Sequence, residues 1–377
     1  MITAIIDSNY IFHKTFGIFS GFGAKSPGDV LSSESDRNMF VRKVMTDLCY
    51  SLNQIPDLHR VIFCKDSRSW RKDYQITRSV YKESRVKSEG VDWGSFFKLL
   101  EELGEFLSDH GYIYSTCGGA EGDDLIWAWS EYLKDSDDHI IVISGDKDMH
   151  QLVRSSDKNW TCIWNSQSKN NKFTVPKNWK LEEEKEPSIF DVTPSSGSND
   201  HKLKHLISSC TIEEIDTKEF VFKKILMGDK KDDVPGVFPH VNKGGKNSNI
   251  AEGKAQKIWD LYAQSPWSSL SMEELWDNDE FLTWLAGLSL RLINQTDNSE
   301  NRAIFKQFYE ENGKLVWLNH RALPEDMVLR LKDHVSKLDS QTPSRTPLVD
   351  KKTMIEKSPW SNDSNTPQAF DPFAFFN

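Results

Sequence analysis

The sequence lacks several features that would assign its class directly. Its five cysteines are scattered and odd in number, without a Cys-x-x-Cys pair, which excludes a thiolate zinc site and fits a reduced compartment. No apolar run approaches the roughly 20 residues that cross a membrane. The first residues form an apolar strand pattern rather than a signal peptide. We therefore expect a cytoplasmic protein with no membrane partner.

The chain also lacks an excess of positive charge. Its 377 residues carry a formal net charge of −10, which argues against non-specific binding to polyanions. A nucleic-acid partner would need local basic patches, and part of the acid excess would then belong to a site of its own. A chain of this length can bury a large core and hold two subdomains with additional segments.

What the sequence does contain is a repeated pairing of short apolar runs with carboxylates. Continuous apolar runs separated by helical patterns predict buried strands of a parallel sheet. Ligands bind such sheets beyond the carboxyl ends of the strands. Four such runs lead into acids, at Ile2–Ile6, Val61–Cys64, Tyr112–Tyr114 and Ile140–Ile143, and a fifth acidic loop follows a helical segment. The acids predicted at this edge are Asp7, Asp66, Glu121, Asp123, Asp124, Asp146, Asp148, Asp229 and Asp232.

One aspartate after a strand is usually a turn residue or a helix cap, and Asp124 could cap the helix predicted at 125–133. The combination of so many acids changes the interpretation, because like charges held together cost free energy unless cations neutralise them. Mg²⁺ and Mn²⁺ prefer carboxylate and water oxygens. Two such ions roughly 4 Å apart catalyse in-line attack on phosphodiesters.

Two segments could contact nucleic acid. Residues 68–87 interleave seven cations with three aromatic rings, which suits phosphates and bases, although a charge run is more often a solvated surface. The loop 228–236 and the helix start after it could bind phosphates through backbone amides, although Pro235-Gly236 could be only a turn. The candidate contacts are Arg68, Arg71, Lys72, Arg78, Tyr81, Lys82, Arg85, Gly236, Lys243, Lys246, Gly253, Lys254 and Lys257.

The pattern along the chain predicts four parts. Residues 1–165 alternate strands and helices as one α/β unit. Residues 166–217 are an insertion, predicted to be partly disordered, with a polar loop at 193–199. A hairpin of 161–164 and 172–175 could join the insertion to the α/β unit. Residues 218–340 are helical, with a capping box at Ser271 and Glu274 and a helix after Pro324.

From 341 to 377 the polar composition predicts a flexible tail. It ends in the aromatic residues Phe370, Phe373, Phe375 and Phe376. Such a peptide cannot fold alone and invites a partner groove, unless it folds back onto its own protein.

These motifs together resemble the 5′ nuclease (flap endonuclease) superfamily, and are most similar in kind to the ribonuclease H (5′→3′ exonuclease) of T-even-type bacteriophages. They occur in order over roughly residues 1–265, which is more specific than any single motif. The segments that carry the resemblance are Ile5-Ile6-Asp7, Trp70-Arg71-Lys72 with Tyr81-Lys82-x-x-Arg85, Glu121-Gly122-Asp123-Asp124, Ser144-Gly145-Asp146-Lys147-Asp148 and Gly228-Asp229-x-x-Asp232-Asp233-Val234-Pro235-Gly236.

The resemblance implies a PIN-like parallel sheet, a helical arch at about 67–95 and a helix–three-turn–helix module at 228–257 that binds duplex DNA. It also implies two Mg²⁺ ions, with Mn²⁺ as a substitute. Asp7, Asp66, Glu121, Asp123, Asp124 and Asp146 would surround the first ion, and Asp148, Asp229 and Asp232 would hold the second. Lys82 and Arg85 would contact the scissile phosphate, and Asp146 would act with them in catalysis.

The chain departs from the family pattern at three places. Asp233 and Gly122 stand where the family usually has Asn and Ala, and residues 238–250 add length to the turn module. These departures concern substrate preference more than catalysis.

The sequence therefore predicts a structure-specific 5′→3′ exonuclease and flap endonuclease that removes RNA primers and adjacent DNA during lagging-strand replication, in an infected bacterial host if the chain is phage-encoded. Its expected partners are DNA and RNA–DNA with 5′ ends, flaps or forks, a sliding clamp that binds the tail, and a single-strand DNA-binding protein.

Three alternatives fit less well. A toprim fold leaves Asp7, Asp66 and the Asp229 loop unexplained, and a PIN-type ribonuclease leaves the 228–236 module unexplained. A non-catalytic DNA-junction adaptor gains nothing from unpaired carboxylates.

Overall fold

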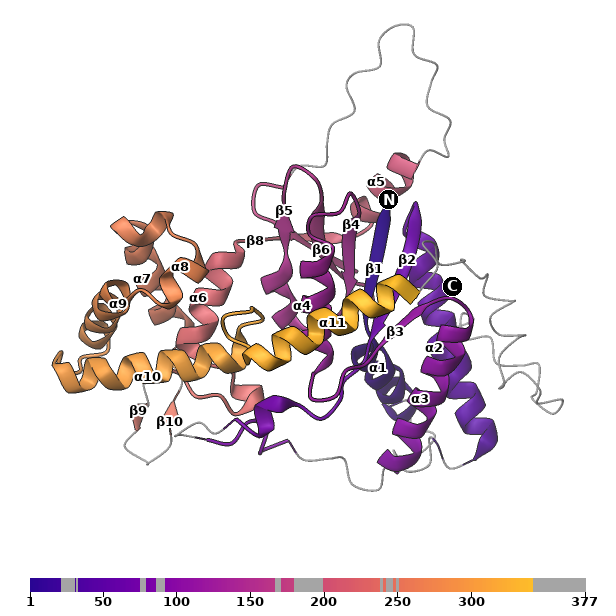
Figure 1. Cartoon of the computed structure of the whole chain (residues 1–377), viewed down its shortest axis with the longest axis horizontal. Coiled ribbons are helices and arrows are strands. Elements are labelled where there is room, and N and C mark those ends of the chain that lie inside the picture. Colours follow the sequence, from indigo (N-terminus) through magenta and orange to yellow (C-terminus); the bar gives the residue numbers. More distant parts are fainter. Residues whose placement is uncertain are drawn as a thin grey trace, which may run out of the picture.

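The computed structural model describes residues 1–21, 31, 33–74, 79–85, 92–166, 171–179, 199–237, 240–241, 247–248 and 251–341. A mostly parallel sheet lies at the centre, helices cover its two faces, and a group of helices stands at one end (Figure 1). In the described residues, no helix is both long and apolar enough to cross a membrane.

The sheet has the order β3-β2-β1-β4-β6-β7-β8, with β5 paired to β6. The strands are parallel except where β6 meets β5 and β7. Their bounds are β1 Ile2–Asp7, β2 Leu58–Cys64, β3 Ile113–Ser115, β4 His139–Ile143, β5 Arg154–Ser155, β6 Trp160–Asn165, β7 Lys172–Pro176 and β8 Thr211–Ile215.

The predicted parallel sheet is confirmed, and burial explains its sequence pattern. Every residue of β1 is buried, because β1 pairs with β2 on one side and β4 on the other and helices cover both faces. A strand enclosed on all sides has no polar face, so it appears in the sequence as a continuous apolar run. The three strands run in the same direction, and their carboxyl ends bring the acidic loops to one edge.

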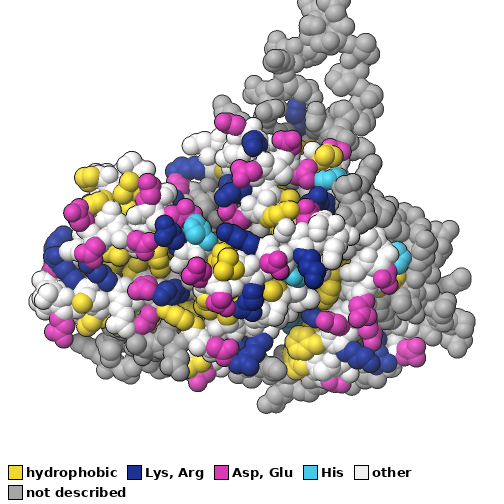
Figure 2. Space-filling model, viewed as in Figure 1, with side chains coloured by type: hydrophobic (Ala, Val, Ile, Leu, Met, Phe, Trp, Pro, Cys, Tyr) yellow, Lys and Arg dark blue, Asp and Glu magenta, His cyan; other side chains and the backbone are white. Residues whose placement is uncertain are grey.

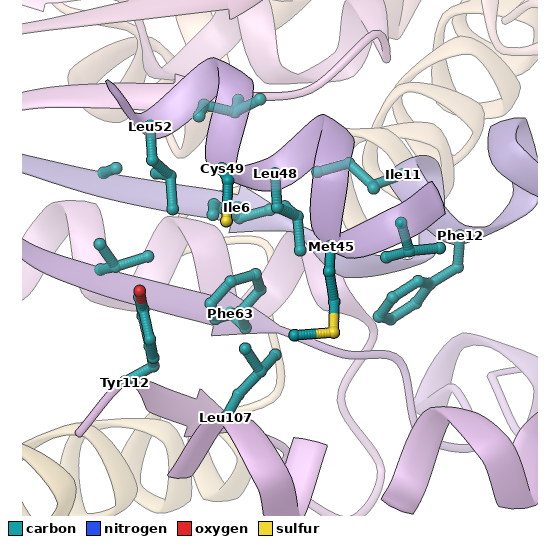
Figure 3. Packing of buried hydrophobic residues seen from close by; sticks show 14 of the residues in the cluster. Ile6, Ile11, Phe12, Met45, Leu48, Cys49, Leu52, Phe63, Leu107 and Tyr112 are labelled. Atoms are coloured by element: carbon teal, nitrogen blue, oxygen red, sulfur yellow. The ribbon is translucent and has the colours of Figure 1, made fainter. Parts of the chain in front are cut away.

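One face of the sheet packs against α1 Ser8–Gly21, α2 Glu34–Gln54 and α3 Trp93–Asp109. Figure 3 shows the side of α2 that faces β1 and β2, with Met45, Leu48, Cys49 and Leu52 turned toward Ile6 and Phe63. The other face packs against α4 Gly122–Tyr132 and α11 Glu325–Gln341. The apolar residues between 96 and 107 recur at helical spacing and form the buried side of α3.

A separate hydrophobic core holds the helices beyond the sheet. They are α6 Thr217–Met227, α7 Glu252–Ala263, α8 Met272–Trp276, α9 Asp279–Leu292 and α10 Ser299–Val316. The capping box at Ser271 and Glu274 begins α8 as predicted. The chain then returns to the sheet as α11, which packs on α4 and β3 and follows Pro324 as predicted.

The segment predicted as an insertion adds to the sheet. The hairpin of β6 and β7 is confirmed, β8 extends the sheet beyond β7, and α5 Asn199–Ser208 packs against the first core through Leu206. A small two-stranded sheet joins β9 His240–Val241 to β10 Asn247–Ser248. Most of the predicted polar loop, and the tail from 342, lie outside the described residues.

Among the described residues, four short 3-10 helices complete the fold: η1 Trp70–Lys72, η2 Lys147–Leu152, η3 Lys230–Asp232 and η4 Pro266–Ser269. The described parts of the predicted arch contain η1, a turn at 81–84 and the start of α3. On the face shown in Figure 2, acidic and basic side chains are interspersed over the described surface, so no single-signed field marks this side.

Candidate metal and nucleic-acid site

The ends of β1, β2 and β4 and the start of α4 bring a first group of carboxylates together. Asp7 ends β1, Asp66 follows β2, Asp123 lies in the first turn of α4 and Asp146 caps η2. Burial, together with the charges of Asp66 and Asp146, raises the pKa of Asp7 to about 7. Burial also raises the pKa of Asp123, and the charges of Asp146, Asp7 and Asp66 add to it. The charged forms of Asp7 and Asp123 are therefore destabilised by burial and by neighbouring carboxylates, and a cation would relieve that cost.

Local hydrogen bonds hold Asp7 in this group. The backbone amide of Tyr10 donates to Asp7 Oδ1 at 3.0 Å, and Ser144 Oγ donates to Asp7 Oδ2 at 2.8 Å. Ser144 belongs to the loop after β4, so the hydroxyl links the ends of two neighbouring strands. These bonds favour the charged form of Asp7 and fix its direction.

A second group lies between η2 and the loop after α6. Asp148 and Asp229 both accept hydrogen bonds from Lys224 Nζ, at 3.0 Å for Asp229 Oδ2. Burial raises the pKa of Asp148 to about 6 even though Lys224 favours the carboxylate. The loop begins at Gly228, which has a φ of +69°. A Cβ added there would lie 2.3 Å from the carbonyl oxygen of Val234, so the position requires glycine.

The basic segment 79–85 lies directly on the acidic loops. Tyr81 Oη donates to Glu121 Oε2 at 3.1 Å and to Asp232 Oδ2 at 3.0 Å. Lys82 Nζ donates to Glu121 Oε1 at 2.6 Å, and Arg85 pairs with Asp232. The prediction that Lys82 and Arg85 lie at the carboxylate edge therefore agrees with this geometry.

Asp233 fastens the same segment to the loop. It adopts the left-handed region with a φ of 59°, which Asn and Asp tolerate better than most residues. Its Oδ2 accepts from the Ser84 amide at 2.7 Å, and its carbonyl accepts from Ser79 Oγ at 2.5 Å. Asp233 stands where the family pattern has asparagine. Like asparagine, it tolerates the left-handed backbone and provides a side-chain oxygen that accepts the Ser84 amide.

Arg71 and Asp124 form a buried pair behind this edge. Arg71 is 2% exposed, and it donates to Asp124 Oδ1 at 2.7 Å, to Asp124 Oδ2 at 3.0 Å and to the carbonyl of Leu315 at 3.1 Å. Asp124 Oδ2 also accepts from the Glu121 amide as part of a capping box. Arg71 therefore has a structural role and is not placed to contact nucleic acid as predicted. Both carboxylate oxygens of Asp124 bind Arg71, so Asp124 is not placed to bind the predicted metal ion.

The other predicted contacts are spread over the surface. Arg68, Lys72, Gly253 and Lys257 are exposed, whereas Lys254 is half-buried. Gly236 and Tyr81, two further predicted contacts, are buried. The hydroxyl of Tyr81 lies within hydrogen-bond distance of Glu121 and Asp232. Arg78, Lys243, Lys246 and the aromatic residues Phe370, Phe373, Phe375 and Phe376 lie outside the described residues.

Sequence reasoning missed Lys224, Ser144 and Gln151. Gln151 donates to the Val316 carbonyl at 3.3 Å and accepts from the Leu318 amide at 2.7 Å, which joins η2 to the end of α10. Two of the three had a signal in the sequence: Ser144 lies in a motif that carries the resemblance, and Lys224 is a lysine five residues before Asp229 on the helix that leads into the acidic loop.

The donor set suits a hard divalent cation, because the groups gathered at the edge are carboxylates. Within the described ranges, no three His, Cys, Asp or Glu side chains converge closely enough to hold an ion as they stand. Cations of the chain itself occupy four of the carboxylates: Lys82 pairs with Glu121, Arg85 with Asp232, and Lys224 with Asp148 and Asp229. An ion would have to replace them.

Comparison with known proteins finds similarity to one family in the first part of the chain. Residues 3–184 match the model of the 5′-3′ exonuclease N-terminal resolvase-like domain. Curated relatives include a 5′-3′ exonuclease of Buchnera aphidicola subsp. Schizaphis graminum, 21% identical over 233 residues, and one of Mycoplasmopsis pulmonis, 24% identical over 259 residues. The matches cover 62% and 68% of this chain and span 64% and 68% of the relatives.

Solved structures similar to the chain include two of the bacteriophage T5 D15 protein. One was co-crystallised with metal ions, is 15% identical and has a TM-score of 0.48 over 90% of this chain and 99% of the T5 chain. The other is a flap endonuclease in a pseudo-enzyme-product complex with DNA and metal ions. It is 14% identical, has a TM-score of 0.49, and the match covers 90% of this chain and 100% of the T5 chain.

Proposed function

Because residues 3–184 match the 5′-3′ exonuclease N-terminal resolvase-like domain and the curated relatives are 5′-3′ exonucleases, we propose that the chain belongs to the 5′ nuclease superfamily. It would be a divalent-metal-dependent 5′→3′ exonuclease and flap endonuclease that hydrolyses phosphodiesters near 5′ ends. One observation carries the proposal. Asp7, Asp66, Asp123 and Asp146 come from four separate segments and act on one another's charge at the edge of the sheet. Holding these like charges together raises the free energy of the folded protein, and bound cations would neutralise them.

The carboxylates divide into two candidate ion sites. Asp7, Asp66, Asp123 and Asp146 would hold the first ion, with Glu121 beside them. Asp148, Asp229 and Asp232 would hold the second. When bound, such ions supply activation of water and neutralise charge on the reacting phosphate.

Lys82 and Arg85 would stabilise the reacting phosphate from the other side. Both are positioned in a segment that contacts Glu121 and Asp232, and both would exchange these carboxylates for phosphate oxygens when substrate binds. A positive charge aimed at the phosphate lowers the barrier if charge grows there in the transition state. No side-chain nucleophile is required.

The nucleic acid would extend from this edge toward α7. The loop 228–237 and the exposed start of α7 with Gly253 and Lys257 would bind the duplex. Substrates would be DNA and RNA–DNA with 5′ ends, flaps or forks, and the role would be primer removal of the ribonuclease H type in lagging-strand replication, with a sliding clamp on the tail.

Cleavage of a 5′-labelled flap tests the proposal directly. We expect cleavage near the junction with Mg²⁺ and none with EDTA. Binding of the flap without cleavage under either condition would instead indicate a non-catalytic junction adaptor. An RNA–DNA substrate with a 5′ RNA end, compared with the all-DNA version, tests the primer-removal role.

A further inference from the structure

Lys224 lies inside the second group of carboxylates and has no part in the function proposed above. It is on α6, and its side chain is 11% exposed. Its ammonium donates to Asp148 and, at 3.0 Å, to Asp229 Oδ2. These acids come from different elements, η2 and the loop after α6, so the lysine joins them across the site.

The surroundings keep this ammonium charged. The ammonium of Lys224 lies against two carboxylates, Asp148 and Asp229, and their negative charge favours the charged form of the lysine. The cation that the two acids share in this structure is therefore supplied by the chain itself. An ammonium with three donors can satisfy two carboxylates at once.

We propose that Lys224 competes with the second divalent ion for Asp148 and Asp229, so that its ammonium sets how tightly that ion binds. The inference rests on the proposed function, which gives these two acids to the second ion. An ammonium and a divalent ion need the same oxygens and repel each other at contact distance. Binding of the ion therefore requires the ammonium to move away on its flexible four-carbon stem.

The neighbouring lysine provides a matched control. Lys223 is on the same helix and is 17% exposed, and it donates to Glu219 at 3.0 Å and to Gln256 Oε1 at 2.8 Å. Lys223→Met removes the same charge and the same stem as Lys224→Met, but it leaves the ammonium on Asp148 and Asp229 in place.

The first experiment is calorimetric titration of the metal-stripped full chain with Mg²⁺ alone. We expect the weaker of two binding events to tighten at least about five-fold in Lys224→Met, the smallest effect of one charge at contact distance in water-like surroundings. Lys224→Arg and Lys223→Met should resemble the wild type. Weaker binding in Lys224→Met would make Lys224 a residue that positions the two acids, and unchanged binding would equally overturn the competition.

The second experiment uses the wild-type chain and does not depend on a variant that folds. An amine-acylating reagent labels lysines, and mass spectrometry measures the rate at Lys224 and Lys223. Saturating Mg²⁺ should raise labelling of Lys224 several-fold, because its ammonium is released, and should leave Lys223 unchanged. Labelling of Lys224 that stays constant would overturn the inference.

The two proposals fail in different ways. If the wild-type chain binds no Mg²⁺, the proposed function fails and the competition with it. If it binds two ions with affinities that Lys224→Met does not change, the proposed function stands and only the competition is lost.

Discussion

Asp146 offers the most direct residue-scale test of the metal site. Asp146→Asn keeps the size and polarity of the side chain and removes one charge from a group that includes Asp7 and Asp123. We expect Mg²⁺-supported flap cleavage to be almost lost, while the metal-free protein melts at the same or a higher temperature because one repulsive charge is gone. Asp157→Asn, on an exposed bend, is the control. Near wild-type turnover would rule out Asp146 as a ligand.

Lys82 and Arg85 should affect the rate of cleavage more than the affinity for DNA. Only interactions that strengthen in the transition state lower the chemical barrier, and these two cations are assigned to charge on the reacting phosphate. Lys82→Ala and Arg85→Ala should slow single-turnover cleavage by more than they raise the dissociation constant. Lys332→Ala, on the exposed surface of α11, is the control. If the variants lost affinity for DNA but cleaved at an unchanged rate, Lys82 and Arg85 would only contact the DNA backbone and would not act on the reacting phosphate.

Arg71 should matter for stability, in contrast to its exposed neighbour. Arg71→Met leaves Asp124 buried without its partner, which costs about 3–5 kcal/mol. Arg68 is 77% exposed and pairs with Asp73, so Arg68→Met should change the free energy of unfolding by less than about 1 kcal/mol. Urea denaturation measures both, and equal effects would contradict the buried role of Arg71.

Sequence reasoning predicted which residues gather but not how each is paired. A strand that ends in a carboxylate places Asp7 or Asp146 at the edge, because the direction of the strand fixes that position. Arg71 pairs with Asp124, 53 residues away in sequence, and also donates to the backbone carbonyl of Leu315 at a distant helix end, and no local pattern records such contacts. For the same reason, the sequence does not show that Arg71, within the basic run 68–87, is buried while Arg68 is exposed.

At the scale of elements, strands were easier to predict than the segments between them. Buried parallel strands have a continuous apolar pattern, and the predicted runs of β1, β2 and β4 match the structure to within a few residues. The parallel pairing of β7 with β8 was missed, because β8 is a half-exposed edge strand with two acids and no such pattern.

Helix α7 carries a prediction about its own role in binding duplex. Lys254 and Lys257 lie in its first two turns, and phosphate contacts release counterions whatever the base sequence. Replacing both with Ala should weaken binding to all duplexes alike and flatten the slope of log affinity against log salt by roughly 1–2 units. The same change at Lys332 and Lys337, exposed on α11, should leave the slope unaltered. An unchanged slope in the α7 variant would remove this helix from the interface.

At the scale of the whole molecule, the tail should serve a partner rather than the reaction. Deleting residues 366–377 should leave cleavage of short flaps nearly unchanged and reduce stimulation by a sliding clamp. A peptide of these residues should bind the clamp with micromolar affinity, about −8 kcal/mol. A lower melting temperature of the truncated protein, with no clamp binding by calorimetry, would show instead that the tail folds back on its own body.

The return of α11 to the sheet determines where such a tail would begin. Near its end, Asp339 pairs with Arg60 at 2.6 Å and accepts from Tyr132 at 3.0 Å. Arg60 lies at the start of β2 and Tyr132 at the far end of α4, so both lie away from the carboxylate edge. A partner bound to the tail would therefore tether the protein at a point remote from the carboxylate edge. The carboxylate edge would then stay free to reorient toward successive 5′ ends while the protein remains attached to the partner.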